Sequence, residues 1–341
     1  MKFKKEYLVL LLVIAALSVY LATRSMNRTH YKLPEPAKVD SQKVNRLTIT
    51  KDGKTIELTR KDDRWYIEPK GYPADDIKVK NMVKAAVDLT VTDLISESGN
   101  YDRYDLNNGK EIRIQAFVGK EKVRNFDLGK TASTYQHTFA RLGDNPDVYQ
   151  VRGALNATFN HTVDDLRDLL VLSFDKGQIN ALTIEKGTHV LTLAKKELPQ
   201  EKKSTPAEGD KKDGDKEEKK AAAPDKPKTQ WQQPDGKAVD QPVVDQLLNE
   251  FSNFKCSGYL DDNAAAGLKN PIWKLTFGNG KESRTFSVFE KEKPDATEYP
   301  AISSTTAYAF LISKNREEQT EKGIDKLLDI VEKAPQTKTA Q

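Results

Sequence analysis

A pattern that occurs twice constrains the fold of this 341-residue chain more than any other feature. In the segment 63–89 a Trp is followed by a Pro, an Asp and apolar residues at helical spacing, and the segment 230–254 has the same order. Two runs of alternating apolar residues precede each copy, joined in the first copy by Asp52-Gly53. Alternation on both sides of Asp-Gly predicts a β-hairpin, and the helical spacing predicts an amphipathic helix capped by the Asp. The chain is therefore predicted to contain a duplicated unit.

The segments that follow each predicted helix also match in order. In the first copy, "EIRIQAFVG", "VRNFDLG", "HTFARLG" and "DVYQV" are short alternating runs, which indicate an antiparallel meander. "VDDLRDLL" in the first copy and "IDKLLDI" in the second return to helical spacing. The predicted fold class is α+β, with an N-terminal transmembrane helix followed by two tandem repeats. Each repeat is predicted as a mainly antiparallel meander: a hairpin plus third strand, an amphipathic helix, further short strands and a closing helix.

The N-terminus contains an uncharged run from Tyr7 to Thr23, which follows a short tail rich in lysine. A run of this length is at the short end of what spans a bilayer, and it exceeds the usual apolar region of a cleaved signal. We predict a transmembrane signal anchor in contact with the lipid bilayer through residues 7–23. A cleaved signal and a buried soluble helix are the alternatives. The short tail favours an orientation with the large domain outside the cytoplasm.

The predicted organisation has five parts. They are a cytoplasmic tail and signal anchor (1–23), a juxtamembrane linker (24–42), a first α+β repeat (43–175), a second repeat (176–334) and a tail (335–341). The second repeat carries an insertion at 195–228 that is rich in lysine, acidic residues and proline. Such a segment buries too little apolar surface to offset its ordering entropy, so the insertion is predicted to be disordered.

Composition excludes several classes of protein. The chain has 55 Lys and Arg against 51 Asp and Glu, and no basic stripe is visible, so a nucleic-acid partner is not expected. Its single cysteine, Cys256, excludes an intrachain disulfide and a metal site made of several cysteines. No cofactor is predicted.

The motifs that resemble catalytic or metal sites have simpler structural interpretations. "LGKT" (128–131) resembles the end of a phosphate loop, but the position that needs a glycine holds Arg124, so a strand-end turn is predicted. The four histidines have no metal-ligand spacing; they are His30, His137, His161 and His189. The adjacent acids at 75–76, 164–165 and 261–262 favour helix capping over acid–base chemistry. No catalytic, cofactor-binding or metal-binding residue is predicted.

The two tryptophans at repeat-equivalent positions, Trp65 and Trp231, have two interpretations. Each lies in a predicted strand beside an amphipathic helix, which favours packing in the core. A platform for a ligand is the alternative.

The ordered set of motifs resembles a bacterial family known only as a domain of unknown function, number 4340. The set consists of the N-terminal apolar run, "WYIEP", "PADDIKVKNMV", "GLKNP", an F-x-L-G strand and "DLRDLL". The first copy departs from the pattern, with Asp105-Leu106 in place of Gly-Leu and no proline after it. The resemblance implies a membrane-tethered envelope protein, often encoded beside ABC transporters of the gliding-motility type. It brings no established catalytic residues.

The expected function is therefore that of a non-enzymatic, membrane-anchored envelope protein, an accessory or binding subunit associated with an ABC transporter or another envelope complex. The expected location is the bacterial inner membrane, with the large domain on the extracytoplasmic side. Two alternatives stay open: an envelope enzyme acting on polysaccharide or peptidoglycan, and a passive periplasmic scaffold.

Overall fold

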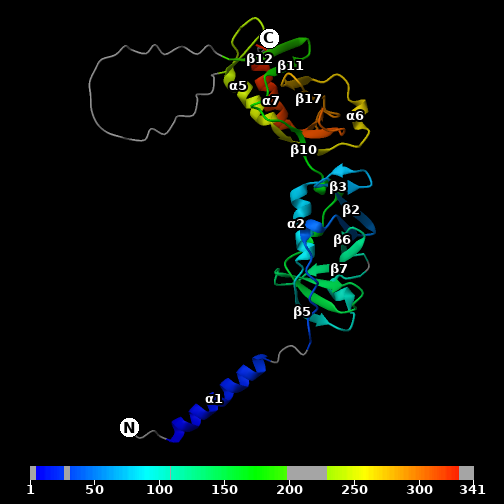
Figure 1. The fold of residues 1–341 in the computed structure, drawn as a ribbon, viewed down its shortest axis with the longest axis vertical. Coiled ribbons are helices and arrows are strands. Elements are labelled where there is room, and N and C mark those ends of the chain that lie inside the picture. Colours follow the sequence, from blue (N-terminus) through cyan, green and yellow to red (C-terminus); the bar gives the residue numbers. More distant parts are fainter. Residues whose placement is uncertain (1–4, 27–30, 108, 198–228, 330–341) are drawn as a thin grey trace, which may run out of the picture. The chain divides into compact units, whose positions relative to one another are not determined.

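The computed structural model describes residues 5–26, 31–107, 109–197 and 229–329. The chain divides into two compact units, unit 1 (Met1–Asp168) and unit 2 (Leu169–Gln341), which Figure 1 draws in blue to green and in green to red. The division falls a few residues before the predicted limit between the repeats, 175/176. Each unit is described by itself.

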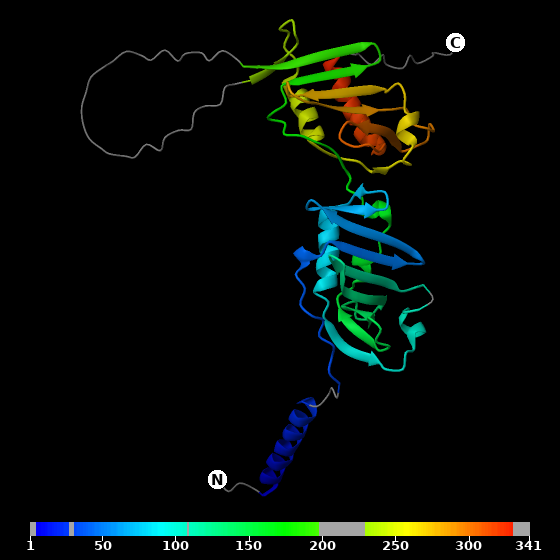
Figure 2. The same cartoon turned by 45° about the vertical axis from the view of Figure 1, so that its right-hand side comes forward.

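Unit 1 is built around one antiparallel sheet with the strand order β4-β3-β2-β1-β6-β7-β8-β9-β5. Its helices are α1 (Lys5–Met26), η1 (Ser41–Lys43), α2 (Asp76–Val87), η2 (Tyr101–Tyr104), α3 (Asn156–Phe159) and α4 (Val163–Leu166). Its strands are β1 (Arg46–Lys51), β2 (Lys54–Lys61), β3 (Arg64–Glu68), β4 (Tyr72–Pro73), β5 (Val91–Ser96), β6 (Ile112–Val118), β7 (Glu121–Thr131), β8 (His137–Leu142) and β9 (Val148–Arg152). In Figures 1 and 2, α2 lies along one face of this sheet.

Unit 2 has a second antiparallel sheet with the order β13-β12-β11-β16-β17-β18-β19-β15, and a small sheet of β10 and β14. Its strands are β10 (Leu170–Ser173), β11 (Ala181–Lys186), β12 (His189–Glu197), β13 (Thr229–Gln232), β14 (Asn253–Lys255), β15 (Gly258–Tyr259), β16 (Trp273–Gly278), β17 (Ser283–Val288), β18 (Glu298–Ser303) and β19 (Phe310–Ser313). Its helices are α5 (Gln241–Phe251), α6 (Ala264–Gly267) and α7 (Lys314–Leu327).

The two large sheets have the same connectivity. Once the short edge strand β4 is set aside, each strand of unit 1 corresponds to the strand of unit 2 that holds the same place in the order. The register agrees as well: Leu47 of β1 is opposite Ala116 of β6, and Leu182 of β11 is opposite Phe277 of β16. The predicted hairpin around Asp52-Gly53 is present, and both turn residues have the positive φ that a two-residue hairpin turn requires (49° and 72°).

The same hydrogen bond joins the third strand to the helix in both units. In unit 1 the backbone N–H of Trp65 donates to Asp76 Oδ1 at 2.9 Å, from the first residue of α2. In unit 2 the backbone N–H of Trp231 donates to Gln241 Oε1 at 2.8 Å, from the first residue of α5. Both indoles are buried, with 2% and 3% of their surface exposed. The prediction that Trp65 and Trp231 pack in the core is confirmed.

Equivalent arginines on β7 and β17 each donate hydrogen bonds to backbone carbonyl oxygens outside their sheet. Arg124 donates from Nη2 to the carbonyl oxygens of Ala37 and Val87, the latter at the end of α2 at 2.8 Å. Arg284 donates from Nη1 to the carbonyl oxygen of Ser173. Arg124 is buried, and this burial lowers the pKa of its guanidinium. The hydrogen bonds to carbonyl oxygens take the place of the water that the buried guanidinium has lost.

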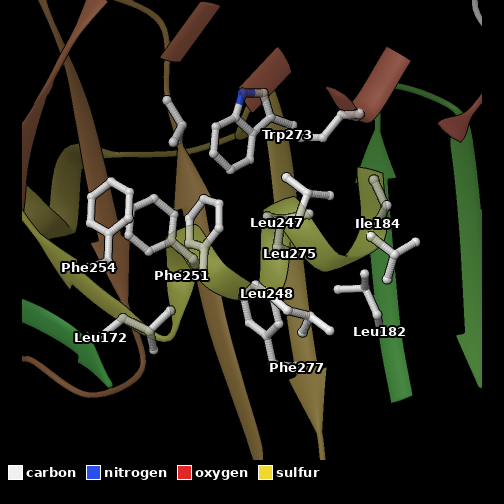
Figure 3. Close-up of a cluster of buried hydrophobic side chains, with 14 of the residues drawn as sticks. Leu172, Leu182, Ile184, Leu247, Leu248, Phe251, Phe254, Trp273, Leu275 and Phe277 are labelled. Atoms are coloured by element: carbon white, nitrogen blue, oxygen red, sulfur yellow. The ribbon is translucent and has the colours of Figure 1, made fainter. Parts of the chain in front are cut away.

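The core of unit 2 is an aromatic cluster between α5 and the sheet, shown in Figure 3. The ring of Phe251, on α5, stacks on Phe254 with centroids 5.0 Å apart and meets Phe286 edge-on at 4.9 Å. Trp273 lies at one end of the cluster, with its ring nitrogen on the side away from Phe277. Offset and edge-on aromatic contacts of this kind add to the stability gained from buried area.

The predicted fold class is wrong, first because of its N-terminal element. Among the described residues, no helix is both long enough and apolar enough to cross a membrane, and α1 is included in this finding. The uncharged run from Tyr7 to Thr23 is helical, but at the rise of an α-helix it extends only about 26 Å, less than a hydrocarbon core of about 30 Å. Both large units are mainly antiparallel sheet.

The predicted closing helix of the first repeat is also wrong. Helix α4 ends at Leu166, because Arg167 is extended (φ −65°, ψ 143°) and its backbone pairs with Ala74 beside β4. The apolar run that follows becomes β10, which pairs with β14 in unit 2. Pairing with strands far along the sequence therefore overrides the helical spacing of "VDDLRDLL". In unit 2 the corresponding closing helix, α7, is formed.

The predicted disordered insertion lies mostly outside the described residues, at 198–228. Its first three residues are not loop but strand: β12 runs to Glu197, and Lys195, Lys196 and Glu197 are opposite Trp231, Gln230 and Thr229. The sequence does not show this extension because Lys and Glu are poor strand formers, and here the partner strand supplies the hydrogen bonds. The predicted tail, 335–341, also lies outside the described residues.

We expect Trp65→Ala to lower the free energy of unfolding by about 3–5 kcal/mol, the usual cost of truncating a large buried aromatic residue. Chemical denaturation of the purified protein measures this change. Ile77→Ala on the outer face of α2, where 74% of the side chain surface is exposed, serves as the control and should shift stability by less than about 0.5 kcal/mol. Equal effects of the two substitutions would contradict a core role for Trp65.

Replacing residues 198–228 by a two-residue Asn-Gly turn should leave the melting temperature unchanged or raise it. Glu197 and Thr229 are already paired across the ladder, so the shorter connection closes a hairpin whose ends are in place. Loop-closure entropy changes with the logarithm of length, which limits the gain to about 2.4 kcal/mol. A melting temperature lowered by several degrees would show that the replaced segment contributes to the fold.

Candidate functional site

The first candidate site is a polar pocket of about 480 Å³ in unit 1, called here the arginine pocket. It is lined by Tyr101, Arg113, Gln115, Lys122, Asn125, Asp127, Arg141, Gly143, Asp144, Asn145 and Pro146. Along β6, Ile112 and Ile114 are buried while Arg113 and Gln115 alternate with them. Because successive side chains of a strand point to opposite faces, the pocket lies on the face of the sheet away from the apolar core.

A buried carboxylate organises the arginine pocket. Asp127 is 4% exposed, and its Oδ1 accepts a hydrogen bond from Arg113 Nε at 2.9 Å. Its Oδ2 accepts from Arg141 Nη2, so both carboxylate oxygens are occupied. The hydrogen bond and the negative charge of Asp127 raise the pKa of Arg113. Arg141 also stacks on the ring of Tyr101, at 5.0 Å from its centroid. Both guanidinium groups are thus fixed in place.

The charges of the arginine pocket leave a positive surplus. Among its lining residues, Arg113, Arg141 and Lys122 are cationic, whereas only Asp127 and Asp144 are acidic. Charged donors with a planar fork suit a carboxylate or phosphate group, which accepts two parallel hydrogen bonds. The pocket is therefore suited to an anionic group.

Unit 2 contains a different pocket of about 450 Å³, called here the acidic pocket. It is lined by Lys186, Gly187, His189, Ile272, Glu290, Tyr299, Glu317 and Glu321. Glu317, on α7, is 1% exposed, and its Oε1 accepts a hydrogen bond from Trp273 Nε1 at 2.9 Å. Burial raises the pKa of Glu317, and the nearby Glu321 adds to this effect.

A third pocket, in unit 1, occupies the repeat-equivalent position and is called here the basic pocket. It has a volume of about 510 Å³ and is lined by Lys51, Asp52, Asp105, Lys110, Gly129, Lys130, Thr131 and Asn156. Lys51 ends β1 as Lys186 ends β11. Leu128 of β7 and Val288 of β17 hold equivalent places in their sheets, opposite Ile112 and Trp273. Lys130 and Glu290 each come two residues later, so they are equivalent as well. The same end of each sheet therefore carries a pocket, basic in unit 1 and acidic in unit 2.

The "LGKT" segment does not form the turn that we predict. Leu128 to Thr131 are the last residues of β7, so they are strand. A side chain at Gly129 would overlap the carbonyl oxygen of Tyr104, which shows that the glycine serves close packing between β7 and η2. Lys130 and Thr131 line the basic pocket.

The paired acids at helix starts act as caps, as predicted. Asp75 Oδ1 accepts from the backbone N–H groups of Ile77 and Lys78, at 3.0 and 3.1 Å. Asp165 forms a capping box with Thr162, and these hydrogen bonds lower the pKa of Asp165. The pair at 261–262 lies before the short α6.

The histidines are not brought together. His137 is in β8, His161 precedes α4 and His189 lines the acidic pocket, while His30 lies outside the described residues. Within the described ranges, no group of three or more His, Cys, Asp or Glu side chains is placed to hold a metal ion. Cys256 is buried.

Sequence reasoning misses the arginine pocket because its parts come from three strands. Arg113, Asp127 and Arg141 lie on β6, β7 and β8, and no local spacing connects them. A weak signal exists in "VRNFDLG", where Asp127 sits between two apolar residues of a predicted strand. It does not reveal which residues on the neighbouring strands pair with that carboxylate.

Comparison with known families agrees with the motifs. The model of the family described as "Domain of unknown function (DUF4340)" matches residues 65–271, from β3 of unit 1 to the residues just before β16 of unit 2. The chain belongs to this family, so the resemblance identified from the sequence is confirmed. No curated protein and no solved structure matches the chain.

We expect Glu317→Gln to change how stability depends on pH. Because the folded-state pKa of Glu317 is raised above its ordinary value of 4.5, its contribution is fully present at pH values below 4.5 and is lost as pH rises through the folded pKa. Relative to the wild type, Glu317→Gln should therefore gain stability as the pH rises above 4.5. Denaturant midpoints measured between pH 4 and pH 8 would check this, and parallel profiles would contradict it.

Proposed function

We propose that the protein is a non-enzymatic binding or accessory subunit of a complex in the bacterial cell envelope. In this proposal the arginine pocket of unit 1 receives an anionic group of the partner protein. The observation that carries it is the buried Asp127, which holds Arg113 and Arg141 in one arrangement on the sheet face.

Fixed guanidinium groups favour binding for a simple reason. An arginine side chain normally loses rotamer freedom when it binds a partner, which reduces affinity. Here the hydrogen bonds to Asp127 and the contact of Arg141 with Tyr101 restrict both side chains before any ligand arrives. Pre-organisation of this kind lowers the cost of binding and favours one orientation of the bound group.

The class of partner comes from the family resemblance. The resemblance implies an envelope protein often encoded beside ABC transporters, so a transporter subunit is the partner we propose. An exposed acidic side chain or a terminal carboxylate on that subunit would supply the anionic group.

Arg113→Gln and Arg141→Gln should each reduce recovery of the partner about tenfold or more, since one charge-assisted hydrogen bond contributes about 1.5–3 kcal/mol. Cross-linking in cells, followed by affinity purification from the envelope fraction, measures this recovery. Lys122→Gln should also weaken binding. It leaves both hydrogen bonds of Asp127 intact, so a loss of partner recovery by this variant is not explained by a disturbed fold.

Arg152→Gln provides the matched control. Arg152 is an exposed residue of the neighbouring strand β9 and does not line the arginine pocket. Its replacement should leave partner recovery unchanged. If Arg113→Gln, Arg141→Gln and Lys122→Gln give the same recovery as this control, the arginine pocket is not the binding site.

A further inference from the structure

The charged trio of the arginine pocket has no counterpart in the second sheet. Asp127 of β7 is opposite Arg113 on one side and opposite Arg141 on the other. The residues at the same register positions in unit 2 are Ser287, Lys274 and Ile302. Both sheets nevertheless form with the same connectivity. The scaffold therefore does not require the trio, although burial of the Asp127 carboxylate costs free energy.

A second difference between the units is a row of polar side chains across β1, β6 and β7. Thr48 Oγ1 donates to Gln115 Oε1 at 3.5 Å, and Gln115 Nε2 donates to Asn125 Oδ1 at 3.2 Å. These two bonds orient both amides, so Asn125 Nδ2 is the last donor of the row. The equivalent residues of unit 2 all lack an amide; they are Thr183, Thr276 and Thr285.

Both arginines keep donors that Asp127 does not use. Arg113 donates to Asp127 from Nε, and within the part of the chain that the structure describes its Nη1 and Nη2 make no hydrogen bond. Arg141 donates to Asp127 from Nη2, while its Nε is buried and has no hydrogen-bond partner among the described residues. A buried donor without a partner is costly, and an acceptor oxygen of a ligand removes that cost.

The rest of the pocket is polar as well. Asp144 is exposed and can accept hydrogen bonds, whereas Asn125 Nδ2 can donate one. The apolar part of the lining is small and consists of Pro146 and the ring of Tyr101. A volume of about 480 Å³ is much larger than one carboxylate group needs. The pocket therefore suits an acid whose neighbouring atoms are also polar.

We propose that the arginine pocket binds the free C-terminus of an extended peptide segment of the partner. This inference rests on the proposed function, in which the pocket receives an anionic group of a partner protein. The terminal carboxylate accepts hydrogen bonds from Arg113 and Arg141, whose planar groups match its two oxygens. In the peptide group that precedes it, the carbonyl oxygen accepts from Asn125 Nδ2 and the N–H donates to Asp144.

The order of polar groups distinguishes a C-terminus from other acids. In a peptide C-terminus the carboxylate is followed at once by an N–H and a C=O, and such ends are a recurring target of recognition. The carboxylate of an aspartate or glutamate side chain is separated from the main chain by methylene groups, for which the pocket offers little apolar wall. A sugar acid has hydroxyl groups in place of the peptide group.

Isothermal titration calorimetry on the purified full-length protein tests the proposal with four probes. They are N-acetyl trialanine with a free C-terminus, its C-terminal amide, the N-acetyl amide of Ala-Glu-Ala, and glucuronic acid. The free-acid peptide should bind saturably and about tenfold or more tightly than each of the others, because it alone makes the charge-assisted contact in this arrangement. Equal affinities, a tighter glutamate peptide or sugar acid, or no saturable binding of the free-acid peptide overturns the proposal.

Three variants assign the contacts. Arg113→Gln should weaken the free-acid peptide about tenfold or more. Asn125→Ala keeps both hydrogen bonds of Asp127 and should weaken it about threefold or more, because one neutral hydrogen bond is lost. Lys274→Gln is the matched control, since Lys274 holds the register position of Arg113 in unit 2. If Arg113→Gln and Asn125→Ala both bind as this control does, the proposal is overturned.

The inference and the proposed function fail in different ways. If the arginine substitutions lower partner recovery but the four probes bind alike, the proposed function stands and the assignment to a C-terminus falls. If the free-acid peptide binds selectively but partner recovery is unchanged in the arginine variants, the C-terminus site stands and the proposed function falls.

Discussion

The antiparallel pairing of the first hairpin strand with the first strand of the meander holds each unit together. In unit 1, β1 pairs with β6 from Arg46 opposite Phe117 to Thr50 opposite Arg113, although more than sixty residues separate them. The pair β11 and β16 does the same in unit 2. Without this pairing unit 1 would have two separate sheets, and no continuous apolar face would span both of them. The connecting helix, α2 or α5, then covers the apolar face of the joined sheet.

The hydrogen bonds between Trp65 and Asp76, and between Trp231 and Gln241, set where that helix starts relative to the sheet. The acceptor is a carboxylate in one unit and an amide in the other, so the geometry is retained while the chemistry differs. The arginines on β7 and β17 also keep one kind of contact: each donates to a backbone carbonyl before the hairpin, Ala37 in unit 1 and Ser173 in unit 2, and Arg124 donates to Val87 as well. The duplicated scaffold thus tolerates exchange of polar groups wherever the hydrogen bond is preserved.

Charge has diverged more than shape between the two units. The pocket at the end of β1 and β7 contains three lysines and two aspartates, whereas its counterpart at the end of β11 and β17 contains three glutamates and one lysine. The arginine pocket adds a further cationic surface on the outer face of the first sheet. Lys130 and Glu290 occupy equivalent places in the two sheets, whereas Glu317 and Glu321 come from α7, a closing helix that unit 1 does not form at this length.

By itself, the sequence determined the local elements and the family. The Asp52-Gly53 hairpin, the cap at Asp75 and the buried tryptophans follow from short-range patterns, and the family follows from their order. Only the tertiary structure decided the ends of α4 and β12, because pairing with distant strands outweighed the local preference of "VDDLRDLL" and of Lys195–Glu197. It also decided the sites. Asp127 meets Arg113 and Arg141, and Glu317 meets Trp273, across strands and helices whose register no local spacing encodes.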